Sequence, residues 1–433
     1  MRARVVVFAL TLASACTVDV SLEGKACASA PPLCLAGYDC IDGQCVRGGP
    51  TGGGNTTGGG GGTVPTCHLF DAEPTSRCGT RTERYLAPTG SDTASGLTPA
   101  EAWATLNNKS LPGGARVHLE AGDYTTANVL DTVTVTGGGA VCPLEITGPL
   151  DGGVAKLKTS TTLHSSNVWV HDLTLAPADT TAAINVPFMS DVRLERLQFR
   201  AAYTGGFPRD VESTGTDQLT ITGCTFASTG GEALNINFGS ATITGNVIVG
   251  AGGQLAIPAG AFFAGNDVSG DWNGPTIVFR SNGDGGLTIV RNVFHDLNTS
   301  SGPLAVTDDA ELVEGNTFFN IAGTAAKTGV FRDNLLVGVT RGSALSAANA
   351  SADFNLFDTV ATPYASGQGA NDLMATATFE PGTFVPAANS PAIDRADPNR
   401  PVPLGGGLRA DIGAFERDAG IDANRRVCLD GGY

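Results

Sequence analysis

The chain has 433 residues, of which 59 are glycine, and 16% of the sequence is charged. This length is enough for one large core, and a composition low in Lys and Glu but rich in Gly, Thr and Asn favours a β-rich extracellular protein over a helical one. The net charge of -16 excludes nucleic acid as an expected partner. It also disfavours unaided binding of polyuronates, unless a basic groove or bridging Ca²⁺ reverses the charge locally.

Residues 1–15 have the pattern of a signal peptide, with two arginines ahead of the apolar run VVVFALTLASA. The final Ala-Ser-Ala fits a cleavage site, and Cys16 follows it directly. The same residues resemble a bacterial lipobox, in which Cys16 would be diacylated, although Ala13 stands where Leu is usual. We expect export, either as an outer-membrane-anchored lipoprotein or as an ordinary extracellular protein. No later stretch is apolar enough to span a membrane, so membrane contact is expected only through the lipid on Cys16.

Residues 16–47 are expected to form a Cys-rich N-terminal module. Four of the ten cysteines lie in CASAPPLCLAGYDCIDGQC, a density that resembles a small disulfide-knotted module of an exported protein. Metal binding is the competing interpretation, but the spacings do not match zinc pairs. Cys142 and Cys428 are left as one further candidate pair. The cysteines expected in disulfides are Cys27, Cys34, Cys40, Cys45, Cys67 and Cys78, the last two paired with each other.

Residues 48–65, GGPTGGGNTTGGGGGTVP, have almost no side chains able to form a core. They indicate a flexible tether that spans about 23 Å on average. A spacer without a tethering role predicts the same composition. The main domain is expected over residues 66–416, followed by a tail at 417–433.

A capping helix is expected near the start of the main domain. Thr98, Pro99 and Glu101 have the capping-box pattern with proline at the first helical position. A short amphipathic helix would cover the unpaired strand edges at the open end of a solenoid. One apolar stripe is made by Leu97, Ala100, Trp103 and Leu106.

Between Val168 and Phe357 the sequence repeats itself about every 23 residues. Nine segments, from VWVHDLTL to ASADFNLF, align without gaps. The residues three before and two after the sixth position are apolar in all nine segments, and six of the sixth positions are Asn. These sixth positions, the markers, are Leu173, Leu197, Cys224, Asn246, Asn266, Asn292, Asn316, Asn334 and Asn355.

A period in this range indicates a solenoid whose turns bury their apolar faces against each other. The Val, Ile, Thr and Phe content and the short alternating runs favour β-strands over helical repeats. Stacked asparagines are expected to form a side-chain ladder inside the coil, and Cys224 is expected to be a buried thiol. Over roughly residues 84–416 the sequence resembles the right-handed parallel β-helix superfamily, the fold of pectate lyases and polygalacturonases. The expected fold class is therefore all-β.

The segments ANSPAIDRADPNRPVP and LRADIGAFE resemble the closing segment of many bacterial β-helix proteins. Asp394 and Asp411 lie in them. We expect these two carboxylates to make turns and hydrogen bonds at the C-terminal cap rather than to catalyse.

The outward positions of the main strand are mostly Thr in the middle of the array, which β-propensity explains better than sugar binding through hydroxyls. A second strand precedes each unit and is more polar outside, so we expect a groove there. His295 follows a core Phe, and we expect it to lie on a turn and to be structural. The outward residues of the second strand include Asn185, Glu212, Asn235, Asn237, Arg280, Asp308 and Lys327.

If the second-strand face is catalytic, Arg280 is the expected base or carboxylate clamp and Lys327 a second clamp. Asp308 with Asp309 would form a weak Ca²⁺ site, the one cofactor expected. A surface ion pair between Arg280 and Asp308 is the competing interpretation. The Asn-Thr-Asp, Asp-Asp, Gly-His-Gly and Arg-Ile-Lys motifs of polygalacturonases do not occur as a set.

Three functions remain open at this stage. The first is a cell-surface or secreted protein that binds polysaccharide or envelope glycan without a recognisable catalytic set. The second is a polysaccharide lyase or glycoside hydrolase that acts on an outer β-helix face. The third is a structural or adhesive stalk. Glycan retention without product would indicate binding, whereas unsaturated or new reducing ends would indicate catalysis.

Overall fold

The computed structural model describes residues 38–41, 44–47, 81–131, 134–136, 142–178, 182–203, 208–251, 255–272, 277–280, 286–299, 304–340, 351–364, 369–400 and 408–417. The chain divides into two compact units, residues 1–64 and 65–433. In the first, β1 (Tyr38–Ile41) and β2 (Gln44–Arg47) form an antiparallel hairpin that pairs Cys40 with Cys45 in register. The expected signal peptide, Cys16, the linker at 48–65, Cys27, Cys34, Cys67, Cys78 and the side chains of Cys40 and Cys45 lie outside the described residues.

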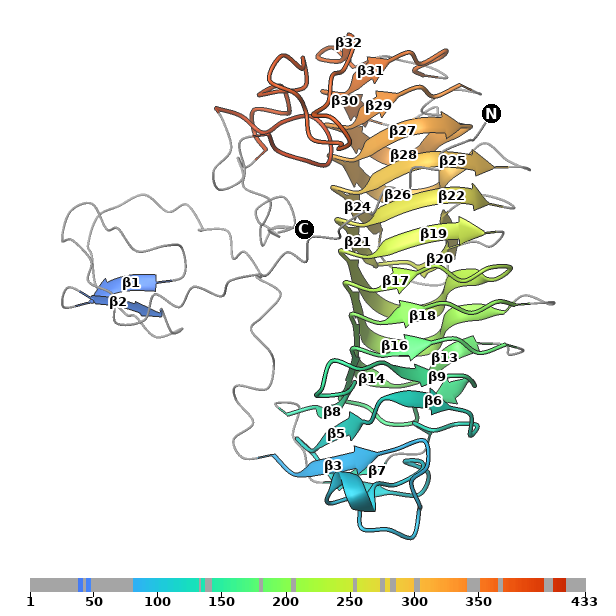
Figure 1. Cartoon of the computed structure of the whole chain (residues 1–433). Coiled ribbons are helices and arrows are strands. Elements are labelled where there is room, and N and C mark those ends of the chain that lie inside the picture. The colour runs from blue at the N-terminus through green and yellow to red at the C-terminus, as the bar shows by residue number, and fades with distance from the viewer. Residues whose placement is uncertain are drawn as a thin grey trace, which may run out of the picture. The chain divides into compact units, whose positions relative to one another are not determined.

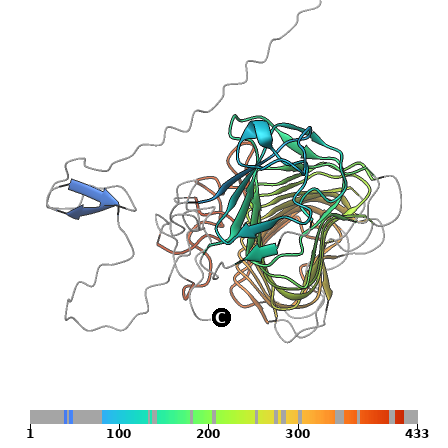
Figure 2. The same cartoon turned by 90° about the horizontal axis from the view of Figure 1, so that it is seen from below.

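The second unit is a parallel β-helix in which strands of successive coils stack along one axis (Figure 1). Viewed along that axis, the coils superpose (Figure 2). Each coil adds one strand to each long sheet, because every pairing between coils is parallel and in register over most of its length. The expected parallel β-helix is thereby confirmed as the fold.

The first long sheet, called here the main sheet, contains the outward positions discussed above. Its order is β3 (Glu83–Leu86), β5 (Arg116–Leu119), β8 (Leu144–Thr147), β11 (Val168–His171), β14 (Ser190–Glu195), β16 (Arg209–Thr222), β18 (Glu232–Thr244), β21 (Phe262–Ala264), β24 (Leu287–Val290), β26 (Leu304–Glu314), β28 (Thr324–Arg332) and β30 (Ser351–Asp353).

The lateral strands are the expected second strands. They are β10 (Thr161–Thr162), β13 (Ala182–Pro187), β20 (Leu255–Pro258), β23 (Ile277–Arg280) and the first parts of β16, β18, β26 and β28, which run on into the main sheet. A small separate sheet pairs β4 (Ser110–Pro112) with β7 (Thr134–Thr136).

The third row of strands, called here the closing sheet, completes each coil. Its order is β6 (Gly122–Tyr124), β9 (Ala155–Leu157), β12 (Thr174–Leu175), β15 (Gln198–Phe199), β17 (Thr225–Phe226), β19 (Val247–Ala251), β22 (Asp267–Trp272), β25 (Val293–Thr299), β27 (Thr317–Ala322), β29 (Leu335–Val337), β31 (Leu356–Asp358) and β32 (Leu373–Met374).

The predicted inward stack and asparagine ladder are both confirmed. The residues three before the markers pair in register from coil to coil, and eight of the nine, from Val170 to Phe331, are fully buried. Each ladder asparagine donates its side-chain amide to the carbonyl oxygen of the next, at 2.9–3.2 Å. The same oxygen accepts the backbone N–H of the preceding asparagine, so these buried polar groups are satisfied.

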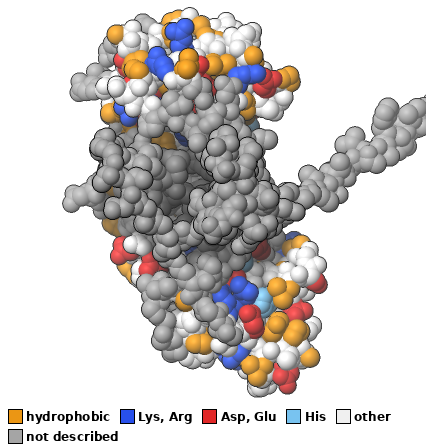
Figure 3. Space-filling model, turned by 90° about the vertical axis from the view of Figure 1, so that its left-hand side faces the viewer, with side chains coloured by type: hydrophobic (Ala, Val, Ile, Leu, Met, Phe, Trp, Pro, Cys, Tyr) orange, Lys and Arg blue, Asp and Glu red, His pale blue; other side chains and the backbone are white. Residues whose placement is uncertain are grey.

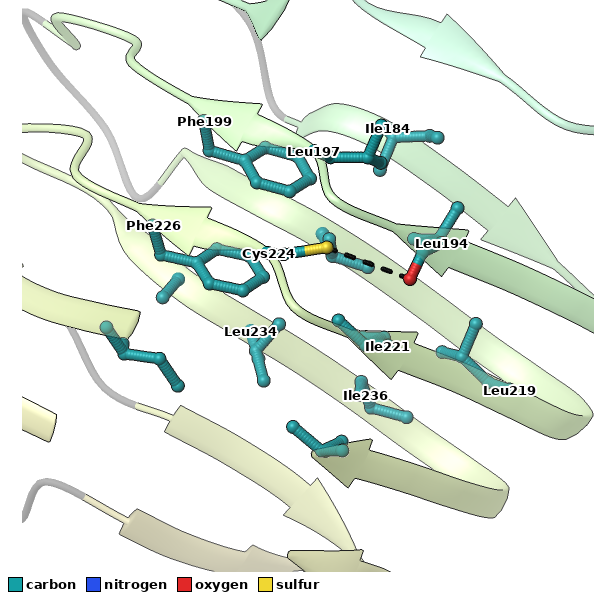
Figure 4. Packing of buried hydrophobic residues seen from close by; sticks show 14 of the residues in the cluster. Ile184, Leu194, Leu197, Phe199, Leu219, Ile221, Cys224, Phe226, Leu234 and Ile236 are labelled. Carbon is teal, nitrogen blue, oxygen red and sulfur yellow. Dashed lines mark hydrogen bonds between the residues drawn. The ribbon is translucent and has the colours of Figure 1, made fainter. Parts of the chain in front are cut away.

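Cys224 is confirmed as a buried thiol. Its Sγ points toward Leu194, to whose carbonyl oxygen it donates at 3.7 Å, with Ile221 and Phe226 packed close by (Figure 4). Its backbone N–H donates to the side-chain oxygen of Asn246 at 2.8 Å, so it continues the ladder by its main chain. Burial raises the pKa of the thiol to about 12, which makes it an inert core group.

The prediction of an amphipathic capping helix is wrong. Over the residues that the structure describes, the helical content is a three-residue 3₁₀ helix, η2 (Pro99–Glu101), and Leu97 is 55% exposed. The Thr98 side chain makes no capping hydrogen bond, and the Glu101 carboxylate accepts from Ser95 instead. Trp103 is buried, and its backbone bonds to Tyr85 and Ala87, so the segment closes the first coil in extended form. No helix within the described ranges is long and apolar enough to cross a membrane.

The C-terminal segment packs on the closing sheet. Ala392, Ala396, Ala410 and Ile412 form an apolar cluster with Leu335 and Leu356. The structural roles expected for Asp394 and Asp411 are confirmed by their hydrogen bonds. The Asp411 carboxylate accepts the backbone N–H groups of Asp394 and Arg417, and the Asp394 carboxylate accepts that of Arg409.

Candidate functional site

The structure brings together the strands that carry the predicted catalytic residues. Arg280 ends β23, Asp308 and Asp309 lie in β26, and Lys327 lies in β28. These strands are neighbours, because β26 pairs with both β23 and β28. The register between β26 and β28 shifts between Val306 and Ala310, beside both aspartates. The side chains of these four residues lie outside the described part, so their roles stay predictions.

The same lateral face is described in full a few coils earlier, on β13, β16 and β18. Asn185, Glu212 and Asn235 are paired in register across three coils, as expected for one outward row, and Asn235 is buried at 2% exposure. Pro187, Thr214 and Asn237 form the parallel row two residues further on. This part of the face, called here the lateral site, therefore presents amide, hydroxyl and carboxylate groups at the spacing of the coils.

Arg209 is the centre of the lateral site. Its Nη1 donates to Oε1 of Glu212 at 2.9 Å, and its Nε donates to Oε2 of Glu232 at 3.1 Å. With its amide turned to face the guanidinium, Asn235 accepts from Nη2 at 3.0 Å. The side chains of Arg209, Glu212 and Glu232 are 26%, 23% and 13% exposed. A half-buried guanidinium with three fixed partners is held in one geometry, and its carboxylates remain accessible from solvent.

A second charged cluster, which the sequence analysis missed, lies on the outer face of the main sheet in the first coils. Glu145 is only 3% exposed and pairs with Arg81 and with Nε of Arg116, the latter at 2.9 Å. Its other oxygen lies 3.1 Å from Nε2 of His171, whose Nδ1 lies 2.6 Å from the Asp172 carboxylate.

Arg196 closes this cluster toward solvent. Its Nε and Nη2 each donate to the Asp172 carboxylate at 2.8 Å, a bidentate pair. Burial alone would raise the pKa of Asp172, but hydrogen bonds from Arg196 and His171 outweigh it and hold that pKa well below its ordinary value. Asp172 is therefore a fixed anion at the rim.

Trp169 anchors the aromatic part of the cluster. Its ring stacks on His171 at 4.2 Å between centroids, and the Arg193 guanidinium lies 5.6 Å from its centroid. Its Nε1 donates to Glu195 at 3.0 Å. Figure 3 views the molecule from the left-hand side of Figure 1 and shows acidic, basic and His side chains close together in its lower part, where the first coils lie.

The burial of this cluster argues against catalysis. Glu145, Trp169 and His171 are at most 6% exposed, so a substrate atom cannot reach the imidazole or the inner carboxylate. The cluster is a buried ion-pair network that joins the first coils. Its sequence signal was present, since Arg116 and Glu145 occupy outward positions, but these coils precede the regular array and lack its markers.

His295 lies in β25, within a strand rather than on the expected turn. Its Nε2 and Nδ1 are each 2.9 Å from a carboxylate, of Asp267 and Asp296 respectively. The hydrogen bond with Asp267 is the main cause of a raised His295 pKa. The ring also lies 5.0 Å from that of Phe384, which packs edge-on against Phe319. His295 thus fastens the C-terminal segment to the closing sheet, in agreement with the structural role expected for it.

Within the described ranges, no three His, Cys, Asp or Glu side chains are grouped so that they could hold a metal ion. The predicted Ca²⁺ ligands Asp308 and Asp309 fall outside that search, because their side chains are not described.

Comparisons with known proteins concern the fold alone. No protein-family model matches the chain, and no curated protein matches it. Among solved structures, a crystal structure of pectate lyase Pel9A is 17% identical with a TM-score of 0.48, over 80% of this chain and 100% of that one. A mannuronic-acid-specific family 6 polysaccharide lyase from human gut microbiota is 16% identical with a TM-score of 0.43, over 66% of this chain and 77% of that one. The GH136 lacto-N-biosidase from Eubacterium ramulus is 12% identical with a TM-score of 0.43, over 69% of each chain.

Proposed function

We propose that the protein binds polysaccharide or envelope glycan on the outer surface of its lateral strands, without catalysing a reaction there. The observation that carries the proposal is the Arg209 guanidinium fixed between Glu212 and Glu232. Binding to a preorganised group loses little side-chain entropy. The free lone pairs of the two carboxylates accept hydrogen bonds from sugar hydroxyl groups, and the neighbouring Asn237 amide both donates and accepts hydrogen bonds.

The charge of the chain supports a neutral ligand over an acidic one. The net charge is -16, and the lateral site holds one arginine against two glutamates. A polyuronate would meet repulsion at this surface. A neutral glycan offers hydroxyl groups, which the carboxylates and amides of the site recognise by hydrogen bonds.

The test is retention on a glycan array together with an activity screen on the same glycans. We expect retention without new reducing or unsaturated ends. Arg209→Ala should weaken binding by about tenfold or more, since it removes the fixed donor and leaves two carboxylates facing each other. Arg200→Ala, an exposed arginine beside the closing sheet, is the matched control and should bind like the wild type. Equal loss in both variants would contradict a localised site.

The enzymatic alternative keeps its predicted place on the same lateral strands. There Arg280 would clamp or deprotonate an acidic sugar, Lys327 would be a second clamp, and Asp308 with Asp309 would bind Ca²⁺. The adjacency of β23, β26 and β28 supports this alternative, because it puts all four positions on neighbouring strands. A third possibility is a structural or adhesive stalk, for which no glycan would be retained.

We further propose that the protein is exported and that a lipid on Cys16 anchors it to the outer membrane. The motif at residues 13–16 supports the anchor, and a released extracellular form is the alternative.

A further inference from the structure

Two exposed phenylalanines mark one corner of the solenoid beside the lateral site. Phe188 is 73% exposed and Phe238 is 47% exposed. Each directly follows the outward row of its coil, since Pro187, Thr214 and Asn237 are paired in register. Gly215 holds the same corner in the coil between them. The order along the axis is therefore Phe188 just after β13, Gly215 in β16 and Phe238 in β18, and Figure 1 shows these three strands in successive coils.

All three corner residues have left-handed backbone, with φ of 50° at Phe188, 68° at Gly215 and 68° at Phe238. Glycine adopts this conformation freely, whereas it is unfavourable for a bulky aromatic residue. The ring of Phe188 leans over the intervening coil, because a Cβ added to Gly215 would lie 2.8 Å from its Cδ1. An exposed aromatic ring and a strained backbone are both unfavourable for folding alone. Their coincidence in two coils points to a function of the rings.

We infer that Phe188 and Phe238 are stacking platforms for the sugar rings of a neutral, extended, β-linked glycan that lies along the solenoid axis. This inference rests on the proposed function and names the class of ligand that is bound. Successive coils are about 4.8 Å apart, comparable to the length of one pyranose unit, so the two rings are two units apart. A chain with a twofold repeat presents the same sugar face at every second unit, and so to both rings.

Gly215 leaves room for the Phe188 ring. The ring lies where a side chain at Gly215 would be, so any other residue at this position would collide with it. Thr214 and Asn237 lie one position away and continue into the lateral site. The corner and the Arg209 cluster are therefore parts of one surface, with rings for the sugar faces and polar groups for the hydroxyls.

The charge and size of the corner select this ligand class. Asp191 and Asp217 are exposed and lie within three residues of Phe188 and Gly215 in the sequence, which disfavours an acidic glycan. A protein partner needs a contiguous surface of several hundred Å² on each side. Two separate rings offer much less apolar surface, but they match a ligand that is contacted ring by ring.

The experiment is calorimetric titration of the full protein with cellohexaose and mannohexaose, and with hexagalacturonate as the acidic comparison. We expect a neutral hexasaccharide to bind, and Phe188→Gly and Phe238→Gly each to weaken that binding by about three- to tenfold. Both variants should melt at the same temperature as the wild type or higher, because glycine relieves the left-handed backbone. Weaker binding in a more stable protein separates the platform from a folding defect. Leu150→Ala removes an equally exposed apolar side chain elsewhere and should bind normally.

Phe188→Trp gives a second readout. Trp103, Trp169 and Trp272 are buried, so an exposed indole at this corner would dominate any change in emission. Neutral hexasaccharide should shift its emission to shorter wavelength.

The other outcomes each decide something. If the glycine variants bind like the wild type while Arg209→Ala does not, the platform is wrong and the proposed function stands. If the glycine variants lose binding and Arg209→Ala keeps it, the platform stands and the Arg209 site is wrong. Preference for hexagalacturonate overturns the neutral class, and no binding by the wild type overturns both proposals. If the glycine substitutions change only the oligomeric mass, the corner binds a second copy of the chain and the platform is wrong.

Discussion

The Asn355 side-chain amide donates to the Asp372 carboxylate at 3.2 Å, and the Asn355 backbone N–H donates to the same oxygen at 2.8 Å. An asparagine at this place donates to the next coil, whereas a carboxylate only accepts. Asp372 therefore ends the ladder. Its second oxygen accepts from the Tyr364 hydroxyl and from the backbone N–H of Gly369, so the last rung is satisfied without a further coil.

The ladder leads to a first prediction, on stability. Asn292→Leu should lower the free energy of unfolding by about 1–3 kcal/mol, because the amide of Asn266 and the backbone of the preceding coil lose their acceptor. Asn355→Leu should lower the free energy of unfolding by less. Asn292 is bonded to an asparagine in the coil on each side, whereas Asn355 is at the end of the ladder and has only Asn334 as an asparagine neighbour in it. Urea denaturation measures both. A larger loss at Asn355 would contradict cooperative stacking.

The second prediction concerns pH. Asp210 is 2% exposed and accepts hydrogen bonds from Ser228 at 2.5 Å and Tyr203 at 3.1 Å, both neutral hydroxyls. Burial raises the pKa of Asp210 to about 7, against 3.8 ordinarily. The folded protein thus keeps the proton that the unfolded chain releases. Its contribution to stability is full below about pH 4 and is lost as pH rises to about 7.

Asp210→Asn should remove this dependence. The variant should gain about 1–4 kcal/mol relative to the wild type between pH 4 and pH 8, because the amide is never charged. Asp217→Asn, an exposed carboxylate on the same strand, is the matched control. Urea denaturation across this range measures the difference. A constant offset between Asp210→Asn and the wild type at all pH values would show that Asp210 does not titrate on unfolding.

The solenoid was predictable from the sequence because each coil needs the same kind of residue at the same position. A position that faces inward in one coil faces inward in the next, so the eight residues that lie three before the markers, the first of them Val170 and the last Phe331, are all apolar. The amide at each marker must find a partner in the next coil, so Asn recurs from Asn246 to Asn355. These signals add over many coils and survive exceptions such as Cys224, whose backbone keeps the ladder bond.

Other features depend on single contacts, which a repeat does not reveal. The helix expected after Thr98 does not form beyond one short turn, because the extended backbone of Trp103 pairs with the first coil instead. The Glu145–His171 network needs the register of coils that precede the array. The corner of Phe188 and Phe238 emerges only when their strands are aligned, because 50 residues separate them in the sequence. For the lateral face, the sequence indicated the correct polar strands but not which side chains pair.

The third prediction tests the anchor. Cys16→Ser should abolish incorporation of labelled lipid and release the protein from membranes, because the serine hydroxyl does not replace the thiol that is acylated. Thr17→Ser, the adjacent residue, is the matched control and should remain labelled and membrane-bound. Mass spectrometry of the mature N-terminus provides the second measurement. Soluble wild-type protein that begins at an unmodified Cys16 would favour ordinary secretion.

The fourth prediction decides between binding and catalysis on the lateral strands. If the protein cleaves a polyuronate, Arg280→Ala should lower the rate by about 10²-fold or more, because proton abstraction loses its base or the substrate loses its clamp. The Asp308→Ala/Asp309→Ala variant should lose activity that added Ca²⁺ does not restore, and chelator should inhibit the wild type to the same degree. Arg200→Ala is again the control. Activity that survives both changes would place the site elsewhere. If no polysaccharide is cleaved while glycans are still retained, the lateral strands bind sugar without reacting with it, and the expected role of Arg280 and Asp308 is then the surface ion pair between neighbouring coils.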